Sequence, residues 1–252
     1  MADLSEHYAL DAEQHRLVST PHGRLEFLRT QELLRRVLMP SARVLDVGGG
    51  TGVHAEWIAR DGHAVRLVDV VPDHVAAASR LPGVTAAVGD ARALAAQDGS
   101  CDVVLLLGPL YHLVEAADRA RALAEARRVL RVGGVLAAAG ISRYLSAIEL
   151  GGNGGLGEDL VPSVAEVIAS GRYDGHAGFT TTHWHTAEEL RAEVLAAGFA
   201  EVTVYGIEGP AWPALDAAGA TEFSAALRCA RLVETDPLMI NSSAHLLAVA
   251  TR

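Results

Sequence analysis

The sequence predicts an α/β fold in which a mostly parallel β-sheet is covered by helices on both faces. Two apolar segments, Val103–Leu107 and Val135–Ala139, are short, unbroken and bounded by Asp or Gly. Such segments alternate along the chain with helical patterns, an arrangement typical of strands that are buried on both faces. The length of 252 residues, half of them hydrophobic, suits one domain with a sizeable core.

Local patterns predict the individual elements. Leucines near helical spacing precede Pro40, and Thr186 with Glu189 forms a capping-box pattern at the start of a helix. The expected strands are residues 43–47, 64–68, 84–88, 102–107, 135–141, 201–205 and 245–250. The expected helices are residues 4–18, 24–38, 53–60, 73–80, 91–96, 115–131, 164–170, 186–197 and 214–234.

Residues 142–182 lack a regular pattern apart from the weak helix at 164–170. The glycine-rich stretch Gly151–Gly155 indicates a flexible segment. A segment of this length without regular structure usually forms a lid or a binding loop. We therefore expect it to cover a site.

Charge and composition exclude several classes of function. The formal net charge of −10 argues against a nucleic-acid substrate, because phosphate binding normally requires a basic surface. All 21 basic residues are arginine, which excludes a Schiff-base, pyridoxal-phosphate or Walker lysine. Cys101 and Cys229 have no metal-ligand spacing, and we expect no metal site. The high Ala and Gly content suggests a bacterial genome rich in G and C.

The sequence also indicates where the protein resides. Met1–Leu10 has no basic segment followed by an apolar one, so it does not read as a signal peptide. The longest apolar segments are far shorter than the roughly 20 residues that span a bilayer. We expect a cytoplasmic protein that does not bind a membrane.

The strongest motif is a glycine-rich turn between a strand and a helix. Asp46-Val47-Gly48-Gly49-Gly50-Thr51-Gly52 follows an apolar strand and directly precedes the helix expected from Val53. Glycines let the backbone turn sharply and approach a ligand, and the start of the helix offers free N–H groups. Asp69 ends the next strand, where a carboxylate can accept both ribose hydroxyls of an adenosine. The motif predicts a nucleotide-type ligand.

The spacing of this turn separates two kinds of ligand. Dinucleotide-binding turns follow G-x-G-x-x-G, whereas this one reads G-G-G-x-G with Val53 next. Asp46 is also unusual for a dinucleotide site, but it suits an ammonium group or an ordered water. An NAD-linked oxidoreductase remains the less favoured alternative, since the chain has no lysine for a Tyr-x-x-x-Lys pair.

These motifs, in order over residues 42–141, resemble those of the class I S-adenosylmethionine-dependent methyltransferases. Val44–Gly52 resembles their first motif, and Gly89–Ala91 the loop that brackets adenine. Asp102–Leu113 resembles their fourth motif, and Glu125–Gly134 the helix and turn before the fifth strand, with Val132 where the family usually has proline. The resemblance implies a Rossmann-like, seven-stranded, mostly parallel sheet whose last strand is antiparallel.

The resemblance also implies a division of one domain, residues 1–252, into four parts. They are an N-terminal helical lid, a cofactor-binding core, a substrate lid and the C-terminal part of the sheet, at residues 1–40, 41–141, 142–185 and 186–252.

By the same resemblance, the glycines would line the methionine half of S-adenosylmethionine, Asp69 would bind the ribose, and Asp90 and Ala91 would meet the adenine. Tyr8, with Arg24 or Arg29, would close over the ligand, since arginine suits a carboxylate. The arginines could equally lie on a solvated helix face. The expected cofactor-binding residues are Tyr8, Arg24, Asp46, Gly48, Gly50, Gly52, Asp69, Asp90, Ala91 and Leu107.

Other residues are candidates for catalysis and acceptor binding. Tyr111 and His112 follow the fourth strand at the end where parallel sheets bind ligands. His112 could act as a base and Tyr111 could orient the acceptor, or the pair could simply pack the loop. The candidates for acceptor binding are Arg143, His183, His185 and Trp212, each of which could instead be structural. His245, at the start of the last strand, is expected to be structural.

The favoured function is transfer of a methyl group from S-adenosylmethionine to O or N of a small molecule, which leaves S-adenosylhomocysteine. A peptide or protein acceptor, or a protein that binds S-adenosylmethionine without methylation, are the alternatives. We expect no nucleic-acid or membrane partner, and either a monomer or a homodimer.

Overall fold

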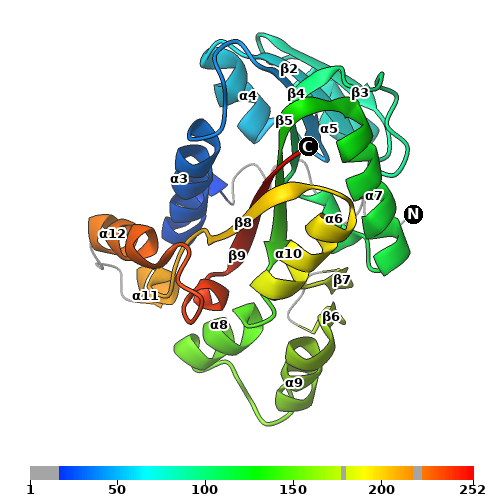
Figure 1. The fold of residues 1–252 in the computed structure, drawn as a ribbon. Helices are drawn as coiled ribbons and strands as arrows, with labels where there is room; N and C mark the ends of the chain where they lie inside the picture. Colours follow the sequence, from blue (N-terminus) through cyan, green and yellow to red (C-terminus); the bar gives the residue numbers. More distant parts are fainter. Residues whose placement is uncertain (1–16, 177–179, 218–222) are drawn as a thin grey trace. The chain divides into compact units, whose positions relative to one another are not determined.

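The structure is a computed structural model that describes residues 17–176, 180–217 and 223–252. Tyr8 and most of the helix predicted at 4–18 lie outside these residues. A seven-stranded sheet has the order β3-β2-β1-β4-β5-β9-β8 (Figure 1). Six strands are parallel and the last is antiparallel, which confirms the predicted fold class. Among the described helices, none is long and apolar enough to cross a membrane.

The strands of the large sheet are β1 Arg43–Val47, β2 Ala64–Asp69, β3 Val84–Val88, β4 Cys101–Leu106, β5 Leu130–Ile141, β8 Ala200–Gly206 and β9 His245–Thr251. A second, two-stranded sheet pairs β6 Arg172–Tyr173 with β7 Thr182–His183. The helices are α3 Pro21–Arg35, α4 Val53–Arg60, α5 Pro72–Ala78, α6 Pro109–His112, α7 Ala116–Val129, α8 Leu145–Asn153, α9 Val161–Ser170, α10 Ala187–Ala196, α11 Trp212–Ala217, α12 Phe223–Val233 and the 3-10 turn η1 Ile240–Ser242.

The chain divides into two compact units, which we describe separately. The β1–β4 unit comprises Leu33–Ala139, Arg191–Thr203 and Ala248–Arg252. The α8–α9 unit comprises Met1–Glu32, Gly140–Leu190 and Val204–Leu247.

The β1–β4 unit is built on strands that are buried on both faces. Leu45, Leu67 and Leu105 are each at most 1% exposed, and burying a side chain of this size contributes about 1.5–3 kcal/mol. The register pairs Asp46 of β1 with Leu67 of β2 and with Leu105 of β4. The carboxyl ends of these parallel strands therefore meet at one edge, where the glycine turn begins.

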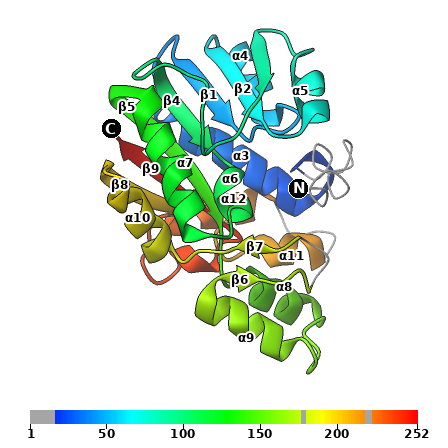
Figure 2. The ribbon, with the colours of Figure 1, turned by 90° about the vertical axis from the view of Figure 1, so that its right-hand side faces the viewer.

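The α8–α9 unit has its own apolar core. Leu25, Trp212 and Leu215 pack together with at most 5% exposure. The small sheet β6–β7 lies beside α9 (Figure 2). There the rings of Tyr173 and Trp184 stack at 4.4 Å. Most of residues 142–182, where the sequence predicts little regular structure, therefore forms helices and short strands.

Several predicted elements differ from the observed ones. Residues 91–96 are not helical, because the Asp90 carboxylate accepts the N–H of Arg92 at 2.8 Å and holds a local turn. Helix α8 was not expected, since its sequence contains two glycines. These occupy its exposed last turn, and Gly154 ends it with a φ of +78°.

The two long predicted helices are shorter or divided in the structure. The helix expected at 115–131 ends at Val129, and β5 begins at the next residue and runs through Gly133-Gly134. A short helix, α6, precedes this helix, α7. The helix expected at 214–234 is resolved as α11 and α12, and residues 218–222 between them lie outside the described ranges. The capping box is confirmed: Glu189 N–H donates to Thr186 Oγ1 at 3.2 Å and Thr186 N–H to Glu189 Oε2 at 3.0 Å.

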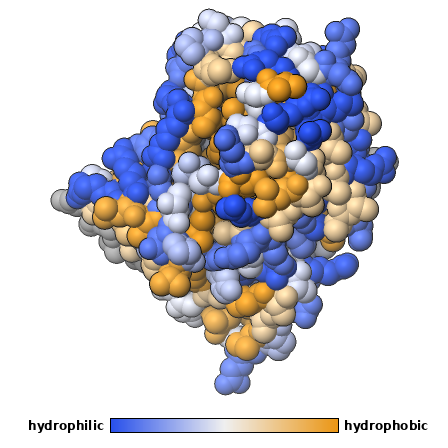
Figure 3. All heavy atoms as spheres, viewed as in Figure 1, coloured by the Kyte–Doolittle hydropathy of each residue, from blue (hydrophilic) through white to orange (hydrophobic). Residues whose placement is uncertain are grey.

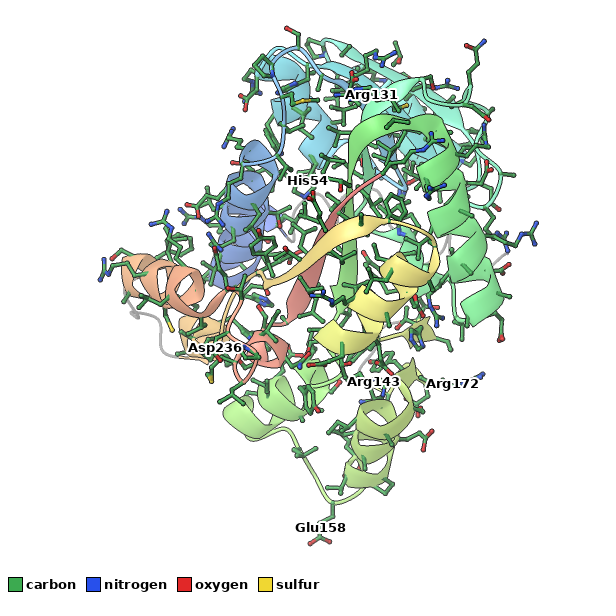
Figure 4. All side chains as sticks on the ribbon, viewed as in Figure 1. His54, Arg131, Arg143, Glu158, Arg172 and Asp236 are labelled. Atoms are coloured by element: carbon green, nitrogen blue, oxygen red, sulfur yellow. The ribbon has the colours of Figure 1, made fainter. Side chains whose placement is uncertain are left out.

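Arginines of α7 and of the start of β5 pair with acidic groups. Arg128 and Arg131 pair with Glu125 and Asp102 at 2.7 Å each. Figures 3 and 4 show hydrophilic residues gathered where Arg131 lies. Arg119 differs: it is 4% exposed. Because acidic groups lie beside the arginines of α7 and the start of β5, these arginines do not form a basic patch that would bind phosphates.

We predict that Arg119→Leu lowers the free energy of unfolding by about 2–4 kcal/mol. The guanidinium donates to Glu193 at 2.7 Å and to the carbonyl oxygens of Leu113 and Val114 at 3.0 and 2.7 Å. All three acceptors would lose a charged donor in a partly buried place. Urea denaturation measures the change.

The control is Arg121→Leu on the same helix. Arg121 is 68% exposed and lies 3.8 Å from Asp118, so its loss should change stability by less than about 0.5 kcal/mol. Equal losses for the two variants would contradict a structural role of Arg119.

Candidate functional site

The turn between β1 and α4 carries three glycines with left-handed backbone, at φ +68° for Gly48, +58° for Gly50 and +93° for Gly52. A Cβ at Gly48 would lie 2.6 Å from Cγ of Pro109, and one at Gly52 would lie 2.5 Å from Cδ1 of Leu81. In the described part of the chain, nothing lies within 4 Å of a Cβ at Gly50. Packing of the protein itself requires glycine at the first and last positions, whereas Gly50 borders open space.

Asp69, at the end of β2, is 6% exposed and holds this turn in place. Its Oδ2 accepts the N–H of Gly50 at 2.9 Å, and its Oδ1 accepts the N–H of Val71 at 2.9 Å and lies 3.3 Å from His74 Nδ1. Burial raises the pKa of Asp69, but these hydrogen bonds outweigh it and leave the pKa below its ordinary value. The group is a charged acceptor at neutral pH with lone pairs to spare.

Asp46 lies beneath the turn and is 1% exposed. Its Oδ2 has no hydrogen-bond partner among the described residues, and a Cβ at Gly49 would lie 2.6 Å from that atom. Burial, together with the charge of Asp69, raises the pKa of Asp46 to about 7. An orphaned buried acceptor of this kind indicates a ligand donor or an ordered water.

Asp90 and Ala91 lie in the loop after β3, and the Asp90 carboxylate has a partner of its own. Arg92 donates to it from Nε at 3.0 Å and from Nη2 at 2.6 Å, and to Asp118 at 2.8 Å. These hydrogen bonds lower the pKa of Asp90. Ala91 is 8% exposed. The carboxylate is therefore rigid and charged.

The segment after β4 brings Tyr111 to the glycine turn. A Cβ at Gly108 would lie 3.2 Å from the carbonyl oxygen of Gly48 and 3.6 Å from the Tyr111 hydroxyl oxygen. The rings of Tyr111 and His112 lie 4.7 Å apart at 55°. Leu107, which precedes Gly108, is half-buried. The β1–β4 unit thus gathers the glycines, Asp46, Asp69 and the Tyr111–His112 pair around the ends of neighbouring strands.

The arginines proposed to close over the ligand belong to the α8–α9 unit and have partners there. Arg24 is exposed and its Cζ lies 5.4 Å from the centre of the Phe223 ring. Arg29 is 0% exposed and donates to Glu32 and Glu234 at 2.5 Å each. The guanidinium of Arg29 is therefore committed to the interior, which leaves Arg24 as the candidate of the two.

Arg143 follows β5 and lies between α9 and the beginning of α10 (Figure 4). Its guanidinium donates to the carbonyl oxygens of Trp184 at 3.3 Å and Ala169 at 3.1 Å, and to the carboxylate of Glu189. Arg143 is 8% exposed. These partners tie α9 to α10 and leave the group little capacity for an acceptor carboxylate.

His183 and His185 lie with their rings 4.6 Å apart and nearly perpendicular. His185 is 0% exposed, and its N–H donates to the carbonyl oxygen of Ile141 at 2.7 Å. A Cβ at Gly140 would lie 3.0 Å from His185 Nδ1, so glycine there makes room for the ring. Of the two rings, only that of His183 is partly exposed.

Trp212 is 1% exposed and belongs to the apolar core of its unit. Its Nε1 donates to the carbonyl oxygen of Ser242 at 3.1 Å, and its ring stacks on His22 at 4.6 Å. The sequence did not indicate this neighbour. His245, expected to be structural, joins His22, Glu26 and Glu208 in one cluster. The available signal in the sequence was a carboxylate, Glu208, shortly after a strand.

Together, the sheet and the turn define an α/β protein that can hold an adenosine-type ligand at the ends of β1 and β2. Three observations fit S-adenosylmethionine: the open space at Gly50, the charged acceptor Asp69 and the orphaned Asp46 oxygen. A ligand ammonium and ribose hydroxyls are donors that such groups accept.

Comparison with known proteins finds similarity to methyltransferases. A family model described as a methyltransferase domain matches residues 44–134. A ubiquinone/menaquinone biosynthesis C-methyltransferase of Acidiphilium cryptum is 35% identical over 103 residues, which cover 38% of this chain and 40% of that protein. A ubiquinone biosynthesis O-methyltransferase of Xylella fastidiosa is 34% identical over 143 residues, which cover 52% of this chain and 56% of that protein.

A solved structure shares the fold along the whole chain. It is a Thermotoga maritima S-adenosylmethionine-dependent methyltransferase described as a possible histamine N-methyltransferase. The TM-score is 0.63 at 21% identity, covering 100% of this chain and 99% of the other. Residues 44–134 thus match a methyltransferase domain, and the fold is that of the solved methyltransferase structure. This chain spans about half, or less, of the length of the two relatives.

We predict that Gly50→Ala weakens binding of S-adenosylhomocysteine at least tenfold while the protein stays folded. The methyl group would enter the open space beside the Asp69 hydrogen bond, and the left-handed backbone would cost about 1–2 kcal/mol. Calorimetric titration measures the affinity. The matched control is Gly62→Ala, because Gly62 also has positive φ and open space but lies in the turn after α4. Equal weakening in both variants would contradict a ligand at Gly50.

We predict that Asp46 makes the protein less stable as the pH rises from 5 to 8. A pKa of about 7 in the folded state lies above the ordinary 3.9, so the folded protein retains a proton that the unfolded chain releases. The stabilisation from this proton is present at low pH and disappears through pH 7, a change of about 2–3 kcal/mol.

The test compares denaturation of the wild type and Asp46→Asn at pH 5 and pH 8. The variant should gain stability relative to the wild type as the pH rises. Asp73→Asn, at an exposed position of α5, should leave the pH dependence unchanged. Parallel curves for the wild type and Asp46→Asn would refute the buried proton.

Proposed function

We propose that the protein transfers the methyl group of S-adenosylmethionine to O or N of a small molecule and releases S-adenosylhomocysteine. The observation that carries the proposal is the Gly50 N–H to Asp69 hydrogen bond of 2.9 Å beside open space. It presets both the turn and a charged acceptor before any ligand binds.

S-adenosylmethionine supplies an activated methyl group. The chain therefore has to bind the methyl donor and the acceptor, orient them toward each other and exclude water. Asp69 accepts the ribose hydroxyls and Asp46 receives the methionine ammonium through its Oδ2. Ala91 lies against the adenine, with Asp90 at its edge, and Leu107 lies under the ligand. Arg24 and Tyr8 are assigned to its closure by family resemblance alone.

The Tyr111–His112 pair acts on the acceptor. The Tyr111 hydroxyl, placed beside Gly108 and Gly48, orients the acceptor atom, and His112 takes the proton when that atom is a hydroxyl or an ammonium. A positioned base of this kind contributes about 10²–10⁴-fold to a rate. His183 and His185 remain assigned to acceptor binding. Arg143 and Trp212 act indirectly, because their polar groups already have protein partners.

A small acceptor is supported by chemistry and by relatives. The net charge of −10 disfavours nucleic acid. One relative is named a ubiquinone/menaquinone biosynthesis C-methyltransferase and the other a ubiquinone biosynthesis O-methyltransferase. The solved structure is described as a possible histamine N-methyltransferase. A monomer or a homodimer would serve equally well.

We predict that the pure protein binds S-adenosylhomocysteine and transfers a labelled methyl group from S-adenosylmethionine to a component of a bacterial metabolite extract. Mass spectrometry should find a product heavier by one methylene. Asp69→Asn, which removes the charge and keeps an acceptor oxygen, should weaken cofactor binding about tenfold or more. His112→Gln should lower kcat with cofactor affinity unchanged.

The outcomes separate the alternatives. Absence of S-adenosylhomocysteine binding would refute the proposal. Binding with no labelled small molecule, followed by label on protein in a lysate, would favour a peptide or protein acceptor. Binding without any labelled product would favour a protein that uses the cofactor for another purpose.

A further inference from the structure

Four polar side chains converge in the α8–α9 unit, outside the residues assigned to methyl transfer. They are His22, Glu26, Glu208 and His245, and one ligand atom of each lies within 4.8 Å of those of all the others. His22 and Glu26 are four residues apart in α3 and so share a helix face. Glu208 follows β8 and His245 begins the adjacent strand β9. We propose that these four residues bind one divalent transition-metal ion, of which zinc is the best match.

The carboxylate of Glu208 is held as a preoriented ligand. It is 0% exposed. Its Oε2 accepts the Ser243 hydroxyl and the N–H of His245, each at 2.9 Å. The same Ser243 Oγ accepts the N–H of Glu208 at 2.7 Å and that of Gly209 at 2.9 Å. These bonds fix Oε2 and leave Oε1 directed toward the rest of the cluster, as outer partners of metal ligands do.

The distances among the ligand atoms match a small ion. Glu208 Oε1 lies 2.6 Å from His245 Nδ1 and 3.7 Å from His22 Nε2, and Glu26 Oε2 lies 3.7 Å from His245 Nδ1. Tetrahedral zinc with ligands at about 2.0–2.1 Å places neighbouring ligand atoms roughly 3.4 Å apart. A substrate ammonium that lies about 2.9 Å from each of its acceptor atoms would instead require neighbouring acceptor atoms to lie about 4.7 Å apart. The three separations bracket the value for zinc, and all are shorter than the value for an ammonium. The shortest is the contact between His245 Nδ1 and Glu208 Oε1, which the ion would replace.

Burial and charge support the same occupant. The side chains of His22, Glu26 and His245 are only 13–15% exposed, and the His22 ring is stacked on Trp212. Two carboxylates with two neutral imidazoles carry a charge of −2, which is costly away from water unless it is compensated. One divalent ion compensates it, and imidazole with carboxylate is a ligand set that zinc accepts. Protonation of both histidines is the competing way to balance the charge.

The test uses the full-length protein, stripped with a chelator and titrated calorimetrically with Zn²⁺ at pH 7. We expect one strong site per chain, and a higher thermal midpoint with the ion bound. His22→Gln and Glu26→Gln, at the two partly exposed positions of α3, should each weaken Zn²⁺ binding at least tenfold. They also avoid the folding risk of changing the fully buried Glu208. His63→Gln, at a histidine outside the cluster in the turn before β2, is the control and should change the affinity less than twofold.

Two further measurements decide between the occupants. Co²⁺ bound in place of Zn²⁺ should give the visible absorption of a tetrahedral site, and this absorption should be lost in His22→Gln. Nitrogen NMR of the histidines should show the His22 and His245 rings losing a ring proton when Zn²⁺ is added. The proposal is overturned if the wild type binds no stoichiometric Zn²⁺, if His22→Gln and Glu26→Gln titrate like the wild type, or if both rings stay doubly protonated in excess Zn²⁺. Because these readouts do not use the methyl donor, they succeed or fail independently of methyl transfer.

Discussion

The hydrogen bond from the Gly50 N–H to the Asp69 carboxylate determines the arrangement of the β1–β4 site. It joins the turn after β1 to the end of β2, so two strand ends share one acceptor. The bond requires the left-handed backbone of Gly50, which glycine adopts without a Cβ penalty. Burial raises the pKa of Asp46 below the turn, and the nearby charge of Asp69 raises it further. Asp69 therefore contributes both to the shape of the turn and to the protonation of Asp46.

Strong local patterns made much of the fold predictable. The ends of β1, α4 and β3 agree with the residues expected from the sequence, since these elements are short apolar strands or a helix directly bounded by turn residues. The errors arose where a side chain or a neighbour overrides propensity. Asp90 captures the N–H of Arg92 and prevents a helix, and α8 tolerates two glycines because they lie in its exposed last turn.

The candidate site was predictable to the extent that it depends on strand ends. Asp46, Gly50 and Asp69 lie at the ends of adjacent parallel strands, and their positions follow from the order of motifs along the chain. Partners contributed by remote segments were not predictable. Arg143 reads as a free cation after a strand, yet Trp184 and Glu189, more than 40 residues later in the chain, occupy its guanidinium. A local sequence pattern does not show which remote residues will bind to a given side chain.

Asp46 and Glu208, two of the buried carboxyls among the described residues, illustrate why partners matter more than burial. Asp46 and Glu208 are both at most 1% exposed, and burial raises the pKa of each. Asp46 faces another carboxylate, so its pKa moves further upward and the neutral form is favoured near neutral pH. Glu208 faces His245 and His22, and its interactions with these rings in their protonated form outweigh burial and hold the pKa of Glu208 well below the ordinary range.

This difference bears on what each group can bind. A carboxyl that is half-protonated at pH 7 can accept a donor from a ligand and give up its proton as it does so, at little cost. A carboxylate that is permanently ionised requires a permanent positive charge beside it, from imidazolium or from a metal ion. Because His22 and Glu208 are separated by most of the chain, only the folded structure identifies which of the two environments a buried acid occupies.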